Sequence, residues 1–360
     1  MASRSSKTVK QSKDNKESPD LDPNSSSTPE NFEKELKELA KKAQDETWTK
    51  SVLQQVSVYV ESIALVTLIA IYSNVSQLAL SPVYGSIPSA IWHSKLIMAA
   101  CFTGWSSNLF LNRLLPFKPA ELLPVIAIYI PTIQFFLYKA SSSLVAEWGP
   151  LVTEALTLFP LMTITAACVA NGLEDADFGF LPKFMADAAP GLSAYALFKT
   201  AEQISGDWIN GHIGRTFLNT RLGMEIALGA SYAMLAPSKL LLLTIPALLH
   251  TALLNTHVPT STALASLNES LKPGQWVVLD RKESLTGYIS VVDSLEGGFR
   301  VMRCDHSLLG GEWVKYIGQG RFKGNQVAEP IYGVFAMLEA VRLVEMPEPI
   351  VDSDAKALVM

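Results

Sequence analysis

The sequence predicts a mostly α, multi-pass membrane domain of about six spans, followed by a small, incomplete α/β region. The first observation is charge, since residues 51–171 hold eight Asp, Glu, Lys or Arg side chains and the fifty residues before them hold twenty. The second is a series of six apolar stretches, and the third is a change to β-branched, alternating sequence after about residue 259. Because each CH₂ removed from water is worth roughly 0.8 kcal/mol, the apolar stretches favour lipid as their solvent.

Residues 1–50 are predicted to form a charged tail. The first thirty or so have almost no large apolar side chains, so they cannot offset the entropy of ordering and are expected to be disordered. Phe32, Leu36, Leu39 and Ala43 then recur at helical spacing, which predicts one short surface helix. The tail has no early apolar core, which argues against a signal peptide.

Residues 51–258 are predicted to be the membrane domain. Bilayer thickness requires roughly 20 apolar residues per helix, and the last two stretches are shorter, so the expected number lies between five and seven. Residues 173–221 carry many charges and predict a polar loop with an amphipathic helix near 194–204. The predicted spans are 56–80, 88–111, 120–137, 151–170, 222–236 and 240–254.

The distribution of basic residues predicts the orientation. With six spans, most Lys and Arg near span ends fall on one side, which the positive-inside rule assigns to the cytosol. Both termini are therefore expected in the cytosol, the lipid bilayer is the expected partner, and an endomembrane such as the endoplasmic reticulum is the expected location. The residues counted on that side are Lys41, Lys42, Lys50, Arg113, Lys118, Lys183, Lys199, Arg215 and Arg221.

Composition excludes several other classes of function. The net charge is −5, and no Lys/Arg cluster alternates with aromatic residues, so a nucleic-acid partner is not expected. The three cysteines and five histidines show no metal-ligand spacing, so no metal site is predicted. Glu61 is the intramembrane polar candidate, because ionisable groups inside a span are functional candidates by default. Glu61 is also near enough to the interface to reach water, and both interpretations stay open.

From about residue 259 the sequence predicts a small β region. Residues 275–279, 285–292, 299–303 and 313–317 read as strands, and the Gly-rich segment after Ser294 is typical of a hairpin. Apolar residues within 331–344 predict a helix packed on the sheet, and 357–360 reads as the start of a buried strand. The third domain is therefore 259–360.

This last region resembles a known enzyme family. The runs LDRKESLTGYISVV (279–292) and GFRVMRCDHSLLGGEW (298–313) resemble the N-terminal β-hairpin region of spermidine/spermine synthases, in particular the membrane-anchored fungal type. EPIYGVFAMLEAV (329–341) is similar to the helix that follows in that family, and KALVM (356–360) to its first Rossmann-type strand. The resemblance covers about 273–360.

The resemblance implies aminopropyl transfer from decarboxylated S-adenosylmethionine to a polyamine. Tyr332 and Glu329 match positions that line the polyamine site in the family, and Asp305 falls where it often has a hairpin aspartate. Gly287 and Gly333 depart from the family pattern, which puts polyamine specificity in doubt.

The family's glycine-rich nucleotide loop and catalytic aspartate would follow residue 360. The chain alone is therefore expected to be inactive and to bind no cofactor, whereas a complete domain would take decarboxylated S-adenosylmethionine or S-adenosylmethionine. Whether the chain is an enzyme is left open. The alternative is a membrane transport or scaffold protein with a non-catalytic docking domain, which the proline-interrupted spans and Glu61 favour mildly.

Overall fold

The computed structural model describes residues 29–174, 182–314 and 329–331. Its contacts divide the chain into two units, residues 1–56 and residues 57–360. The predicted disordered segment lies almost entirely outside the described residues. Where one short surface helix was expected, the chain instead enters the long helix α1, Pro29–Tyr84, which continues through the first predicted span.

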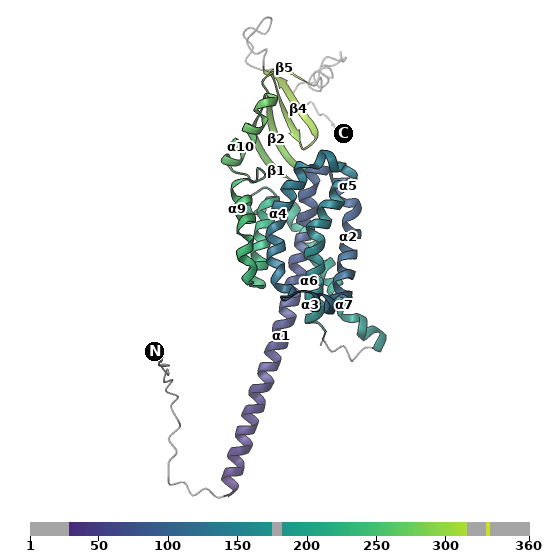
Figure 1. Cartoon of the computed structure of the whole chain (residues 1–360), viewed down its shortest axis with the longest axis vertical. Coiled ribbons are helices and arrows are strands. Elements are labelled where there is room, and N and C mark those ends of the chain that lie inside the picture. The colour runs from purple at the N-terminus through teal and green to yellow at the C-terminus, as the bar shows by residue number, and fades with distance from the viewer. Residues whose placement is uncertain (1–28, 175–181, 315–328, 332–360) are drawn as a thin grey trace, which may run out of the picture. The chain divides into compact units, whose positions relative to one another are not determined.

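The second unit begins with helices (Figure 1). Short 3₁₀ turns at Pro119–Leu122, Phe217–Asn219 and Lys239–Thr244 introduce α4, α8 and α9. Thr220 caps α8, since its side chain accepts a hydrogen bond from the Gly223 amide, and it thereby pairs a donor that the helix start would leave free. The helices after α1 are α2 (Ser86–Ser106), α3 (Asn108–Leu114), α4 (Leu123–Lys139), α5 (Ser141–Leu156), α6 (Leu158–Gly172), α7 (Lys183–His212), α8 (Arg221–Leu235), α9 (Ile245–Leu253) and α10 (Ser261–Leu271).

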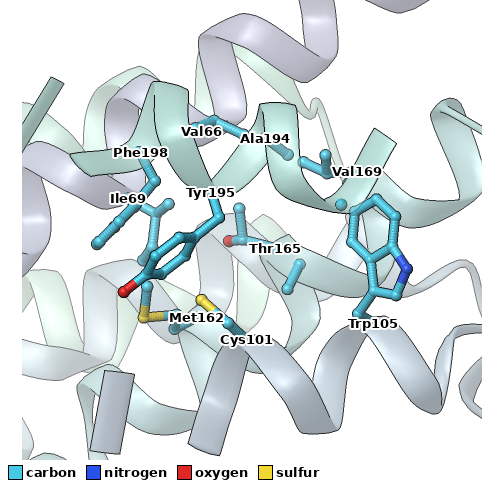
Figure 2. Close-up of a pocket in the computed structure, with 12 residues that line it drawn as sticks. Val66, Ile69, Cys101, Trp105, Met162, Thr165, Val169, Ala194, Tyr195 and Phe198 are labelled. Atoms are coloured by element: carbon cyan, nitrogen blue, oxygen red, sulfur yellow. The ribbon is translucent and has the colours of Figure 1, made fainter. Parts of the chain in front are cut away.

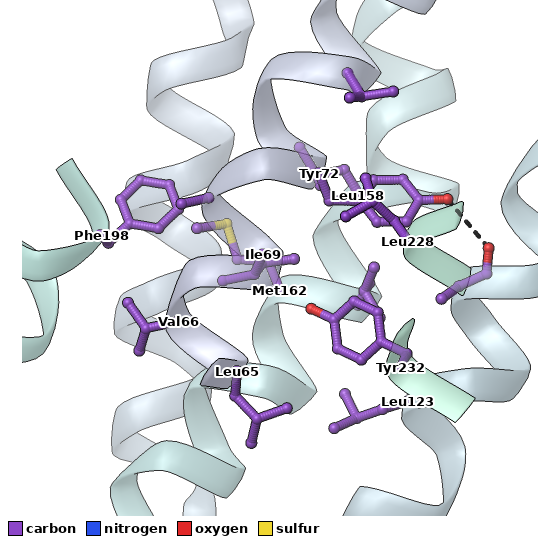
Figure 3. Close-up of a cluster of buried hydrophobic side chains, with 14 of the residues drawn as sticks. Leu65, Val66, Ile69, Tyr72, Leu123, Leu158, Met162, Phe198, Leu228 and Tyr232 are labelled. Atoms are coloured by element: carbon purple, nitrogen blue, oxygen red, sulfur yellow. Dashed lines mark hydrogen bonds between the residues drawn. The ribbon is translucent and has the colours of Figure 1, made fainter. Parts of the chain in front are cut away.

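The helical core is built around α1, α4, α6 and α8. Tyr72 of α1 is fully buried and donates its hydroxyl to the backbone oxygen of Ala127 at 3.1 Å, so a buried polar group is paired. Figure 3 shows Tyr72 and Tyr232 among the aliphatic side chains of Leu158, Met162 and Leu228. The packing is close, because a Cβ on Gly104 of α2 would lie 2.2 Å from a backbone oxygen of α6.

The number of predicted spans is wrong. Among the residues that the structure describes, three segments are long and apolar enough to cross a membrane by length and composition: Gln55–Tyr84, Pro119–Lys139 and Ser141–Gly172. The predicted span 88–111 is interrupted at Ser107, between α2 and α3. The predicted spans 222–236 and 240–254 become the 15-residue α8 and the 9-residue α9, both short of the roughly 20 residues a bilayer requires.

The β region is an antiparallel meander. Its strands are β1 (Trp276–Ser284), β2 (Gly287–Ser294), β3 (Phe299–Cys304), β4 (Ser307–Trp313) and β5 (Glu329–Pro330), in the order β1-β2-β3-β4-β5. Val278, Val292 and Val301 form its buried face, against which Leu264 and Leu267 of α10 pack.

The predicted fold class is therefore wrong. We expected about six spans followed by a hairpin, a helix and the first strand of a Rossmann-type sheet. The described residues form a helical unit with three candidate spans and a wholly antiparallel sheet, on which α10, a helix that precedes the sheet, packs. The predicted helix 331–344 and strand 357–360 lie outside the described residues, except Ile331. The predicted polar loop also differs, because 183–212 is the 30-residue helix α7.

Candidate functional site: a polar cleft beside strand β1

The candidate site lies where the loop between α7 and α8 meets β1. Gly214 in this loop has φ +75°, and a Cβ there would lie 2.3 Å from the backbone oxygen of Glu283. Only glycine combines that conformation with so close an approach. The loop therefore fixes the start of α8 directly against the strand.

Arg221, the first residue of α8, joins the helices to the sheet. Its backbone N–H and Nη1 both donate to Glu283 Oε2, at 2.8 and 3.2 Å. Its Nε donates to Leu78 O of α1 at 2.7 Å, and Nη2 donates to Ser284 O at 3.0 Å. Both side chains of the pair are almost fully buried, with 2% and 3% exposed. A buried pair of charges is tolerated only when it is hydrogen-bonded in this way.

A small cavity of about 20 Å³ adjoins this pair. Three buried polar atoms of its lining have no hydrogen-bond partner among the described residues: Gln134 Nε2, Tyr138 Oη and Glu225 Oε1. Such atoms are costly unless something satisfies them, and a cavity of this size admits about one water molecule. The cavity is therefore polar but too small for an organic substrate.

An open cleft of about 420 Å³ lies beside the cavity and shares His257 and Tyr288 with it. Its volume falls within the range of ligand pockets. Arg281 lies 5.2 Å from the centre of the Tyr288 ring and donates to Thr256 O at 2.6 Å. The cleft is thus built from the α7–α8 loop, the segment before α10, and strands β1 and β2.

Electrostatics define what the cleft can do. Burial, reinforced by the charge of Arg281, lowers the pKa of His257 to about 4, so its imidazole is neutral at neutral pH and can both donate and accept a hydrogen bond. Burial also raises the pKa of Glu283, against the opposing influence of Arg221. Arg215, Arg281 and Lys282 line the cleft with Glu283 as the acidic residue. The excess of positive charge favours an anionic group in a ligand.

Of the predicted site residues, the structure describes Asp305, Glu329 and Glu61, which belong to three different elements. Asp305 lies in the β3–β4 turn with φ +48°, and its Oδ1 accepts from the Tyr288 amide at 2.7 Å, which is a turn-stabilising role. Glu329 belongs to β5, while Tyr332 lies outside the described residues. Glu61 is exposed on α1. Within the described part of the chain, no group of three His, Cys, Asp or Glu side chains could hold a metal.

A second cavity, of about 60 Å³, lies among α1, α2, α6 and α7 and is apolar (Figure 2). Figure 2 shows Trp105 and Tyr195 at its wall, with Cys101 and Met162 between them. Burial raises the pKa of free thiols in such surroundings and makes them inert. This cavity therefore has room for an apolar group, and the side chains that line it supply no acid–base chemistry.

Sequence reasoning missed Arg221, Glu283 and His257 as site residues. Arg221 was counted only as a basic residue flanking a span, and Glu283 lay between two predicted strands, within the run that carried the family resemblance. The two are 62 positions apart, so only the folded chain reveals the pair. The one local signal is Arg221 itself, a charge placed directly against an apolar run.

Comparison with known proteins identifies a methyl-transferring enzyme as a relative. It is the N-terminal histidine N-methyltransferase of Emericella nidulans, which is 41% identical over 303 residues. The match includes 82% of this chain and 53% of that protein, so the chain spans about half the length of the curated relative it matches. No family model matches, and no solved structure matches.

This relative corrects the predicted family and function. The resemblance to spermidine/spermine synthases is wrong, and so is polyamine aminopropyl transfer, because the similarity to a methyltransferase extends over most of the chain. The resemblance depended on residues 273–360, and their described part is an antiparallel meander, whose alternating pattern is common to unrelated sheets. The alternative of a transport or scaffold protein is not supported by the comparison either. The relative implies S-adenosylmethionine as the cofactor, where we expected a cofactor only for a complete domain.

Proposed function

We propose that this chain takes part in methylating the N-terminal histidine of a polypeptide, with S-adenosylmethionine as the methyl donor. The observation that carries the proposal is the 41% identity to an N-terminal histidine N-methyltransferase over 303 residues. The alignment includes 82% of the chain and is therefore much longer than a single motif. The activity and the substrate both remain part of the proposal, since the chain spans 53% of that relative.

The described residues do not fit the cofactor. Nucleoside ligands of doubly wound sheets bind at the carboxyl ends of parallel strands, whereas every strand pair among the described residues is antiparallel. The cleft beside β1 also carries an excess of positive charge, which disfavours the sulfonium of S-adenosylmethionine. We therefore derive no step of methyl transfer from these residues and assign the helices and the sheet to the enzyme's framework.

A chimera tests the proposed function. The part of the Emericella nidulans enzyme that aligns with this chain is replaced by this chain, and the product is incubated with S-adenosylmethionine and a peptide that begins with histidine. We expect methylation of the first residue, and none on a matched peptide beginning with alanine. A chimera that is soluble in detergent, monodisperse and inactive, beside an active parent enzyme, would contradict the proposal.

We also propose that the helical part contacts a lipid bilayer. Three segments have the length and composition of spans, and large apolar side chains point outward from the helices. Phe102, Met234 and Leu253 are between 75% and 77% exposed. Monomers in water rarely expose so much apolar surface, and helices satisfy their own backbone hydrogen bonds as a lipid environment requires.

Extraction of membranes from expressing cells with alkaline carbonate tests the lipid contact. We expect the chain to stay in the membrane pellet and to dissolve only with detergent. Recovery of folded chain in the supernatant without detergent would contradict lipid contact. The cytosolic position of both termini and the endomembrane location stay predictions.

A further inference from the structure

A chain of hydrogen bonds crosses four helices in the interior of the bundle. Ser73 Oγ of α1 lies 3.0 Å from His93 Nε2 of α2, and His93 Nδ1 lies 2.5 Å from Glu154 Oε1 of α5. On its other side, Ser73 Oγ lies 3.0 Å from Glu202 Oε1 of α7. Lys199 Nζ then contacts Glu202 Oε2 at 2.5 Å. Four side chains and a surface lysine therefore form one connected path.

The path runs from the interior to the surface. Glu154 and Ser73 are fully buried and His93 is 5% exposed. The side chain of Glu202 is 16% exposed, and that of Lys199 is 47% exposed. Glu154 Oε2 is buried and has no hydrogen-bond partner in the described structure. A charge at this depth is costly unless it can be neutralised by a proton, and the path provides a route for one.

The geometry holds the path in place. Asn74, next to Ser73, donates from Nδ2 to the backbone oxygen of Glu202 at 2.6 Å and to Ser205 Oγ at 2.9 Å. These bonds fix α7 against α1 at the residue where the path leaves the interior. The titratable groups that face His93 are Glu154 from α5 and, through Ser73 of α1, Glu202 with Lys199 from α7. The sequence of α6, which also packs on α2, contains no Asp, Glu, Lys, Arg or His.

Proton accounting shows that the path has two equivalent arrangements. The Ser73 hydroxyl has one hydrogen and can donate either to Glu202 or to His93. If it donates to Glu202, His93 carries both ring protons and donates one to Ser73 and one to Glu154. If it donates to His93, the ring keeps only the Nδ1 proton, and a protonated Glu202 donates to Ser73. The total number of protons is the same, and two proton shifts along the bonds, from His93 Nε2 to Ser73 Oγ and from Ser73 Oγ to Glu202 Oε1, convert the first arrangement into the second.

A nucleophilic role for Ser73 fits the surroundings less well. The order Ser–His–Glu matches the atoms of a hydrolase triad, but a triad serine must reach a substrate and an oxyanion site. Ser73 is fully buried within α1 and lines neither of the two cavities described above nor the cleft. We propose that Ser73, His93, Glu154 and Glu202 are a proton relay, which takes up a proton at the α7 surface and delivers it to the buried His93–Glu154 pair.

The test follows the ring nitrogens of His93 by NMR in the full chain, with ¹⁵N-labelled histidine and His93→Gln for assignment. We expect a His93 titration curve with two inflections, one of which belongs to Glu202. That inflection should be lost in Ser73→Ala, which removes the bridging hydroxyl, and in Glu202→Gln. Ser76→Ala is the matched control, because Ser76 is a buried serine of the same helix without a hydrogen-bond partner, and it should leave the curve unchanged.

Two results would overturn the relay. One is a wild-type curve with a single inflection. The other is a second inflection that survives in Ser73→Ala or in Glu202→Gln. If Ser73→Ala does not fold, the titration curves of Ser73→Thr and Glu202→Gln are compared instead. Ser73→Thr keeps the hydroxyl and should keep the second inflection, whereas Glu202→Gln, at the partly exposed end of the path, should lose it.

Discussion

The buried Arg221–Glu283 pair should hold the helices and the sheet together as one coupled unit. Arg221→Met leaves the Glu283 carboxylate, with 3% of its side chain exposed, without its cation. It also removes the donors to Leu78 O and Ser284 O. Breaking a buried pair on one side costs about 3–5 kcal/mol. Glu283→Leu should cost a similar amount, nearer 3 kcal/mol, because Arg221 keeps its two carbonyl acceptors.

The double variant, Arg221→Met with Glu283→Leu, shows whether the two side chains stabilise the fold as a coupled pair or independently of each other. Replacing both charges by apolar groups removes the isolated charge and leaves three groups without their partner, the carbonyls of Leu78 and Ser284 and the backbone N–H of residue 221, at about 1 kcal/mol each. The expected cost of the double variant is therefore about 2–4 kcal/mol, far below the sum of the single costs. The exposed pair Lys272–Glu269, with 66% and 68% of its side chains exposed, is the control, and Lys272→Met should cost less than about 1 kcal/mol.

Denaturant unfolding in detergent micelles, followed by tryptophan fluorescence, gives the free energy of unfolding for each variant. A coupling energy of about 3 kcal/mol or more would agree with the structure. Single costs that add to the cost of the double variant within about 0.5 kcal/mol would refute it, because they would mean that the two side chains do not meet.

Three further changes test other parts of the structure. Lowering the pH from 7 to 5 should reduce the free energy of unfolding by about 2 kcal/mol through His257, because the pKa of its imidazole is about 4 in the folded chain and about 6.5 in the unfolded chain. This stability is lost as the pH falls below 6.5, and unfolding of His257→Gln at the two pH values should lack this component. Gly104→Ala should destabilise the folded chain by about 1–3 kcal/mol in thermal unfolding, because the added Cβ would lie 2.2 Å from a carbonyl oxygen. In the control Gly211→Ala, the added Cβ meets nothing within 4 Å, so this variant should be tolerated. Asp305→Ala should cost about 1–2 kcal/mol by leaving the Tyr288 amide unpaired, and Asp305→Asn, which keeps an acceptor, should cost less; equal melting temperatures would show that the turn does not need the side chain.

The sequence allowed helices to be located but not counted as spans. Residues 56–80 lie within α1, and residues 120–137 lie within the 3₁₀ turn Pro119–Leu122 and α4, because long apolar runs with few charges are unambiguous. The interruption at Ser107 and the shortness of α9 depend on tertiary packing that hydropathy does not record. The alternating pattern near 276–304 predicted strands, yet it could not distinguish an antiparallel meander from the start of a parallel sheet.

The candidate site was less accessible to sequence reasoning. Arg221 and Glu283 are 62 positions apart, and His93 and Glu154 are 61 positions apart. Neither pair has a local motif, so each exists only through the packing of distant segments. The family resemblance failed for a related reason, since turn and strand patterns in a short β region do not specify which group an enzyme transfers.

The role proposed for this chain is in the N-methylation of an N-terminal histidine. Its most direct measurement is mass spectrometry of a histidine-initiated peptide after incubation with S-adenosylmethionine and the chimera in which this chain replaces the aligned half of the Emericella nidulans enzyme. The account predicts one added methyl mass, located by fragmentation on residue one. A peptide of unchanged mass from a folded chimera, under conditions where the parent enzyme methylates it, would contradict the claim.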